Sequence, residues 1–113
     1  MMDVLKLLQS KNRCIEKLLE LSEEFLRAAT PESLNSPESN LPSYETRRQA
    51  IIGAVGLFDR KINEAISLLL PSERTPELLE ALRADMDRGE ALLQHVLLSD
   101  EQVMSRIQGA QAD

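Results

Sequence analysis

All five prolines of the chain lie in two short stretches, at positions 31, 37 and 42 and at positions 71 and 76. Proline lacks the amide hydrogen that a helix interior needs and clashes with the preceding turn, so both stretches interrupt any helix. They leave three long segments in which apolar residues recur three or four positions apart, a spacing typical of amphipathic helices. The sequence therefore predicts an all-α fold, an antiparallel bundle of three long helices in one domain over residues 1–113.

The prolines also set the expected boundaries of the helices. The predicted elements are a first helix at about 3–29, a mobile Pro/Ser-rich loop at 30–42 (TPESLNSPESNLP), a second helix at about 44–70, a third helix at about 76–108 and a frayed tail at 109–113. Ser43 is expected to cap the second helix and Pro71 to end it. Thr75 and Pro76 suit the N-cap and the first position of the third helix.

Composition and charge exclude several classes of function. Aromatic residues make up only 3% of the chain, so an aliphatic core is expected. The net charge of -6 disfavours nucleic acid and anionic membranes as partners. No apolar run approaches the roughly 20 residues that a membrane-spanning helix needs, so no membrane insertion is expected. The single Cys14 and the absence of a signal-peptide pattern in MMDVLKLLQSKNR indicate a cytoplasmic location.

Two similar stretches, LFDRKINEAI and LSDEQVMSRI, place an aspartate beside the apolar residues of the second and third helices. Asp100 falls inside the apolar side of its helix and Asp59 at the edge of its own. A carboxylate in such a place must be paired or near water, because an unpaired buried charge is very costly. Counting outward from the turn between the helices sets Asp100 opposite Arg48 and Asp59 opposite Arg88. We therefore hypothesise a structural pair of Arg48 and Asp100 that fixes the register of the two helices.

The sequence supports a catalytic role for the polar residues less well than a structural one. Asp59 and Asp100 are expected about 20 Å apart along the helix axis, whereas paired catalytic carboxylates lie within about 10 Å. His95 is the single histidine and could accept a phosphoryl group, but Val96 and two leucines follow it where a phosphate-binding cation would be expected. A metal site lacks a second histidine. We assign no catalytic, cofactor-binding or metal-binding residue and expect no enzyme activity.

The helical faces indicate what is buried and what is exposed. One third of the circumference of the third helix holds the residues expected to be buried, which are Leu78, Leu82, Leu92, Leu93, Val96, Val103 and Ile107. Gly53 and Gly56 lie inside the second helix, where each is expected to let a neighbour approach closely. A thinner apolar line on the second helix consists of Ala50, Ala54, Leu57 and Leu68. These side chains are either isolated exposed residues or a docking face for a partner helix.

Three stretches carry a resemblance to a known family: LSEEFLRAA (21–29), YETRRQAI (44–51) and LLQHVLLSDEQVMSRI (92–107). Together they resemble the FliT and FlgN type of flagellar type III export chaperones, which are small acidic helical proteins. In that family a leucine-serine pair begins the last part of the first helix, and a Glu-x-Arg-Arg run lies at the start of the second helix. The loop at 30–42 is longer and richer in proline than is usual there, and glycines in the second helix are unusual.

The resemblance implies a cytoplasmic chaperone that binds a helical segment of a late flagellar subunit, such as a filament-cap or hook-associated protein. It would keep this client from premature assembly and deliver it to the export apparatus, without a cofactor. A homodimer is compatible with this role. The expected partner-binding residues are Leu57, Leu68, Leu92, Val96, Leu98, Val103 and Ile107, with the third helix as the movable element. Two alternatives stay open, a phosphotransfer bundle that uses His95 and a self-associating structural bundle.

Overall fold

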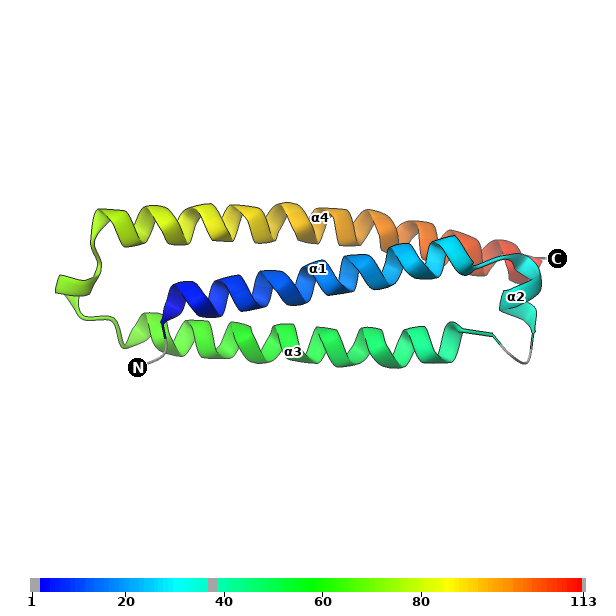
Figure 1. Ribbon diagram of the computed structural model, residues 1–113, viewed down its shortest axis with the longest axis horizontal. Coiled ribbons are helices and arrows are strands. Elements are labelled where there is room, and N and C mark those ends of the chain that lie inside the picture. Colours follow the sequence, from blue (N-terminus) through cyan, green and yellow to red (C-terminus); the bar gives the residue numbers. More distant parts are fainter. Residues whose placement is uncertain (1–2, 37–38, 113) are drawn as a thin grey trace.

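The computed structural model of the protein describes residues 3–36 and 39–112. Its elements are α1 (Val4–Ala28), α2 (Pro31–Asn35), α3 (Leu41–Ser67), the 3-10 turn η1 (Pro71–Glu73) and α4 (Pro76–Ala112). These described residues contain no strand, so the predicted all-α fold is confirmed. The three long helices lie side by side in a rod that measures 61 × 20 × 17 Å (Figure 1).

Helix α1 lies between the other two long helices. It packs against α4 and against α3, whereas α3 and α4 scarcely approach each other along their backbones. The chain runs in the same direction in α1 and α4 and in the opposite direction in α3 (Figure 1). Nine residues of α1 are buried, compared with only Tyr44 and Ile62 of α3. The first helix is therefore the centre of the fold.

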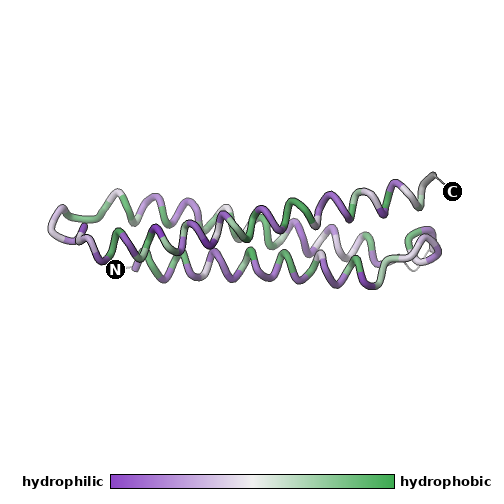
Figure 2. The backbone as a smooth tube through the Cα atoms, turned by 90° about the horizontal axis from the view of Figure 1, so that it is seen from above, coloured by the Kyte–Doolittle hydropathy of each residue, from purple (hydrophilic) through white to green (hydrophobic). Residues whose placement is uncertain are grey.

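The core consists of three clusters along the rod, each with residues from all three long helices. One end holds Val4, Leu7, Leu8, Ile62 and Leu82, the middle holds Ile15, Leu18 and Val96 with Ile51 and Val55 of α3 packed against them, and the other end holds Leu21, Phe25, Ala29, Tyr44 and Val103. The buried residues of these clusters are aliphatic except for Phe25 and Tyr44, whose rings stack with centroids 4.4 Å apart. Apolar positions recur over the length of each long helix (Figure 2), which is the pattern that predicted the bundle.

The predicted loop at 30–42 contains a short helix, so that prediction is wrong for part of the segment. α2 begins after Thr30, whose hydroxyl accepts a hydrogen bond from the amide of Ser33 at 3.0 Å. The Ser33 hydroxyl in turn accepts one from the Thr30 amide at 2.9 Å. This capping box and the proline at the first helical position favour one helical turn. Two further residues of the predicted loop, 37 and 38, lie outside the described part.

The ends of α3 also differ from the prediction. The helix begins at Leu41, so Ser43 lies inside the first turn and is not its N-cap. Pro42 is tolerated there because the first amides of a helix have no intrahelical partner. The helix ends at Ser67, three residues before the predicted end, and Pro71 begins η1. A proline at position 71 would clash with the carbonyl of residue 67 in a continued helix.

Helix α4 begins as predicted and ends later than predicted. Thr75 caps it, since its hydroxyl accepts a hydrogen bond from the amide of Leu78 at 3.2 Å. Residues 109–112, expected to fray, are helical, and residue 113 lies outside the described part. The side chain of Asn35 in α2 donates to the carbonyl of Ala110 at 3.2 Å, and Ala110 is buried. The segment predicted as a mobile loop therefore holds the end of the last helix.

Candidate partner-binding groove

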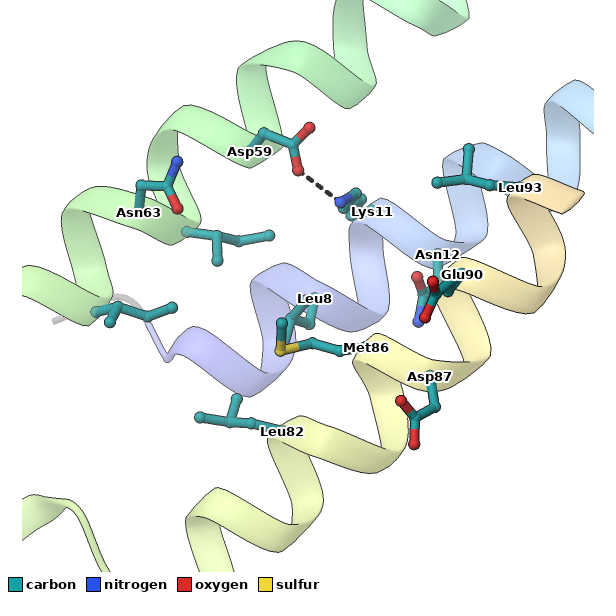
Figure 3. A pocket seen from close by; sticks show the side chains of 13 residues that line it. Leu8, Lys11, Asn12, Asp59, Asn63, Leu82, Met86, Asp87, Glu90 and Leu93 are labelled. Atoms are coloured by element: carbon teal, nitrogen blue, oxygen red, sulfur yellow. Dashed lines mark ion pairs between the residues drawn. The ribbon is translucent and has the colours of Figure 1, made fainter.

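A groove lies between α3 and α4 and contains two hollows, the first of which has α1 as its floor. Near one end it widens into a hollow of about 390 Å³, lined by residues of all three long helices. In Figure 3, Met86 reaches from α4 toward Leu8 of α1, and Asp59 lies on the opposite wall in α3. A second hollow of about 450 Å³ lies toward the other end, between Tyr44 of α3 and Met104 of α4.

The α4 wall of this groove carries a row of exposed apolar residues. We call Leu79, Met86, Leu93, Leu97 and Met104 the α4 stripe. Their side chains are between 40% and 63% exposed. The spacing of seven, seven, four and seven residues puts all five within about 40° of the helix circumference at 100° per residue. The α4 stripe is about 37 Å long at 1.5 Å per residue.

The α4 stripe is distinct from the face of α4 that packs on α1. The buried residues Leu82, Val96 and Val103 lie on average about 80° around the helix from the stripe. Leu93 was expected on the buried face, and that prediction is wrong because its side chain is 40% exposed. Two adjacent apolar faces are what a helix at the corner of a four-helix bundle presents to its two neighbours.

The α3 wall shows the same right-angled arrangement with different chemistry. Ile52, Asp59 and Asn63 lie about 80° around the helix from Tyr44 and Ile62, which face α1. Asp59 and Asn63 line the first hollow, and Ile52 is 36% exposed. The three long helices therefore occupy three corners of a square. The groove is the fourth corner, opposite α1.

The predicted ion pair between Arg48 and Asp100 is present in the structure. An Nη of Arg48 donates to Oδ2 of Asp100 at 2.8 Å, and each side chain is about a quarter exposed, at 28% and 23%. This hydrogen bond raises the pKa of Arg48 above its ordinary value, although burial alone would lower it. The pair joins α3 to α4 in the second hollow, and thus restrains the relative height of two helices whose backbones scarcely approach each other.

The predicted pairing of Asp59 with Arg88 is wrong. Lys11 of α1 binds Asp59 instead, with its Nζ 2.6 Å from Oδ1, and Arg88 forms an ion pair with Glu16 of α1. The prediction assumed that α3 and α4 face each other along their whole length. Because α1 lies between them, each of the two charged residues meets a partner on α1.

A buried amide joins α1 to α4 in a way that the sequence analysis missed. Asn12 is 4% exposed, and its side chain donates to the carbonyl of Asp85 at 2.9 Å. A Cβ atom on Gly89 would lie only 2.5 Å from Oδ1 of Asn12, so the glycine makes room for the amide. A polar residue in the apolar face of the first helix was the signal that could have found this contact.

The expected close approach at Gly53 and Gly56 is not observed. No described atom outside their own turns lies within 4 Å of a Cβ atom built on either glycine. Gly53 is exposed and lies on the side of α3 opposite α1, whereas Gly56 is half-buried beside the groove. The glycine that does allow close packing is Gly89, in α4 and not in α3.

The residues expected to bind a partner do not form one surface. Val96 and Val103 are only 4% and 3% exposed, and Leu92 and Ile107 pack partly buried against the same clusters. Leu92 and Val96 therefore belong to the core, whereas Val103 and Ile107 belong to the core and also line the second hollow. The other three are exposed and point away from the groove, Leu57 on α3, Leu68 directly after α3 and Leu98 on α4.

Other candidate chemistry has little geometric basis. His95 lies on an exposed part of α4. Among residues 3–36 and 39–112, no group of three or more histidine, cysteine, aspartate and glutamate side chains could hold a metal ion. None of the helices described here is both long enough and apolar enough to cross a bilayer. Comparison of the chain with protein-family models, curated proteins and solved structures finds no match.

Proposed function

We propose that the protein is a carrier that binds an amphipathic helix of a client protein in the groove between α3 and α4. The observation that carries this proposal is the α4 stripe, whose five exposed apolar residues border the open fourth corner of the bundle. A client helix in this groove would complete a four-helix bundle and cover the stripe. Recognition of an amphipathic helix by an apolar groove is a common mode of peptide binding.

The size of the stripe suits reversible binding. Each of its side chains is roughly half exposed, so covering one would contribute about 1 kcal/mol, and covering all five about 5 kcal/mol. Losses of rotational and side-chain freedom offset part of this gain, and the expected affinity is modest. A carrier must release its client, whereas a permanent subunit interface needs a larger and more apolar contact.

For the client, we propose a late flagellar subunit such as a filament-cap or hook-associated protein, bound in the cytoplasm and delivered to the export apparatus. Support for this comes from the resemblance of residues 21–29, 44–51 and 92–107 to FliT and FlgN type chaperones. The net charge of -6 suits the role, because like charges on the exterior keep a carrier dispersed while it holds an apolar segment. Binding of this kind needs no cofactor.

Binding in the groove does not require α4 to move, in contrast to the expectation for a movable third helix. Val96 and Val103 anchor α4 to the core. Arg106 of α4 also donates to the carbonyls of Leu26 and Ala29 at the end of α1, at 3.0 and 3.1 Å. The α4 stripe is accessible while these contacts stay in place, so a client helix can dock on a preformed surface.

The test is affinity capture from the source cell with wild-type protein and with the variant Leu93→Glu/Leu97→Glu. We expect the wild type to recover flagellar axial proteins and the variant to lose them, because two carboxylates would lie in the apolar contact. Leu57→Glu/Leu68→Glu is the matched control with the same change of charge, since these residues are 45% and 71% exposed and lie away from the groove. Recovery of axial proteins by the groove variant would refute the groove, and their absence from the wild-type sample would refute the flagellar role.

Sedimentation of the pure protein separates the carrier from a self-associating bundle. A carrier with an open groove is expected to be a monomer across the concentrations used for binding. A stable dimer that Leu93→Glu/Leu97→Glu dissociates would instead make the groove a contact between two copies of the chain.

A further inference from the structure

The charges around the groove are unevenly paired. Its two cations already have partners within the chain, since Lys11 binds Asp59 and Arg48 binds Asp100. Glu45, Asp87 and Glu90 also line the two hollows, and none of these three forms an ion pair with another residue that the structure describes. The groove therefore presents unpaired negative charge on both of its walls.

Both of the unpaired acids on α4 line the first hollow, with Glu90 about 35° and Asp87 about 95° around the helix from the middle of the α4 stripe. Figure 3 shows Asp87 and Glu90 on successive turns of α4, with Leu93 further along the same helix. A helix that covers the stripe would pass within reach of these carboxylates. Cations beside the apolar residues of that helix would pair with them, whereas acids there would be repelled.

Gly56 marks the midpoint of the α3 wall. Because α3 and α4 run antiparallel and Arg48 pairs with Asp100, Gly56 lies at about the height of residue 92, next to Leu93 of the stripe. In the interior of a helix a glycine is less favourable than alanine. At Gly89 this cost is explained by Asn12, whose side chain occupies the space that a Cβ atom would need. At Gly56 no described neighbour occupies that space.

We propose that the partner is a cationic amphipathic helix that places a large apolar side chain over Gly56. Lysine or arginine residues flank its apolar row and pair with Glu45, Asp87 and Glu90. Its large side chain, a leucine, methionine or aromatic residue, fills the notch between Ile52 and Asp59 that the missing Cβ leaves. This inference rests on the proposed function, since it describes the helix that the same groove accepts.

The first test uses two synthetic helical peptides of about 25 residues, the length that spans the stripe. Both have the same row of leucines, one with lysine and the other with glutamate at the flanking positions. We expect the lysine peptide to bind about tenfold more tightly at low salt, with the difference shrinking as salt is added. Equal affinities would refute the cationic partner while leaving the groove in place. Absence of binding by either peptide would refute the groove itself, and with it the proposed function.

A pair of variants locates the charge effect on the protein. Asp87→Asn/Glu90→Gln should weaken binding of the lysine peptide about fivefold and reduce its salt dependence. Glu20→Gln/Glu23→Gln changes the net charge by the same amount on the exposed side of α1, and should leave the affinity nearly unchanged. Equal losses in both variants would show that only the overall charge matters, which would contradict the proposal.

A second pair of variants tests the notch. Gly56→Leu fills the space beside the groove, and Gly53→Leu places the same side chain on the side of α3 away from it. Neither new Cβ meets a described atom within 4 Å, and leucine favours a helix, so thermal unfolding of the peptide-free protein should shift upward in both. We expect Gly56→Leu to weaken binding of the lysine peptide about tenfold, and Gly53→Leu to leave this binding unchanged. Equal affinities of the two variants would overturn the assignment of Gly56.

Discussion

Helix α4 has two faces that are both apolar but differ greatly in environment. The face toward α1 holds Leu82, Val96 and Val103, none of which is more than 7% exposed. The α4 stripe holds leucines and methionines that are at least 40% exposed. The apolar character of the side chains does not distinguish the two faces. The difference comes from their neighbours, because α1 covers one face and the other borders the open corner of the bundle.

Burial of an apolar face in this fold therefore depends on whether a neighbouring helix packs on it. A helix with two apolar faces at right angles is built for two neighbours, and α4 has only one along most of its length. Methionine at two of the five stripe positions suits an adaptable contact, since its flexible side chain fits partners of different shape. The α4 stripe is therefore the surface of the protein that best suits packing against another helix.

The largest expected effect comes from placing the same charge on each face. Val96 and Leu97 are adjacent in the sequence, with 4% and 63% of their surface exposed. Val96→Asp would bury a carboxylate among Ile15 and Leu18 and should lower the free energy of unfolding by about 4 kcal/mol or more. Leu97→Asp should change it by less than about 1 kcal/mol. Chemical denaturation followed by circular dichroism measures both, and similar losses would mean that the two faces are equally buried.

The second prediction concerns Gly89, the glycine whose missing side chain leaves room for Asn12. Gly89→Ala should cost about 2 kcal/mol in the free energy of unfolding, because the new Cβ would lie 2.5 Å from Oδ1 of Asn12. In the double variant Asn12→Ala/Gly89→Ala that overlap is gone. The cost of the double variant should thus be smaller than the sum of the two single costs. Additive costs in a double-mutant cycle would show that the glycine and the amide do not share the site.

The helices, their order and the Arg48–Asp100 pair were within reach of the sequence, because apolar spacing and proline positions act locally. The pair followed from counting residues outward from one turn. The partners of Asp59 and Arg88 did not follow, because they depend on α1 lying between α3 and α4. The spacing of Leu93 fits a buried face as well as an exposed one. Only the arrangement of all three helices distinguishes the two faces. This is also why the expected partner-binding residues include Leu92 and Val96 of the core.

The third prediction concerns the pair that joins the two walls of the groove. Asp100→Asn should lower the free energy of unfolding by about 1 kcal/mol, since the pair is partly exposed and the amide keeps one hydrogen-bond acceptor. The raised pKa of Arg48 means that its stabilising effect is present below the ordinary arginine pKa and is lost only at still higher pH. The cost of Asp100→Asn should therefore be the same at about pH 6 and pH 9. A cost that vanished at pH 9 would point to a different titrating group.

The smallest effects are expected at the two glycines of α3, and their sign is opposite to that at Gly89. Gly53→Ala and Gly56→Ala should each raise the free energy of unfolding by about 0.5–1 kcal/mol, because alanine favours the helix and its Cβ meets no described atom within 4 Å. The two gains should add, since the side chains of residues 53 and 56 contact no common partner. Thermal and urea unfolding of the peptide-free protein measure them. A loss of stability at Gly56 would show that the free protein already uses that space, and would leave Leu93 and its neighbours without an open notch on the facing wall.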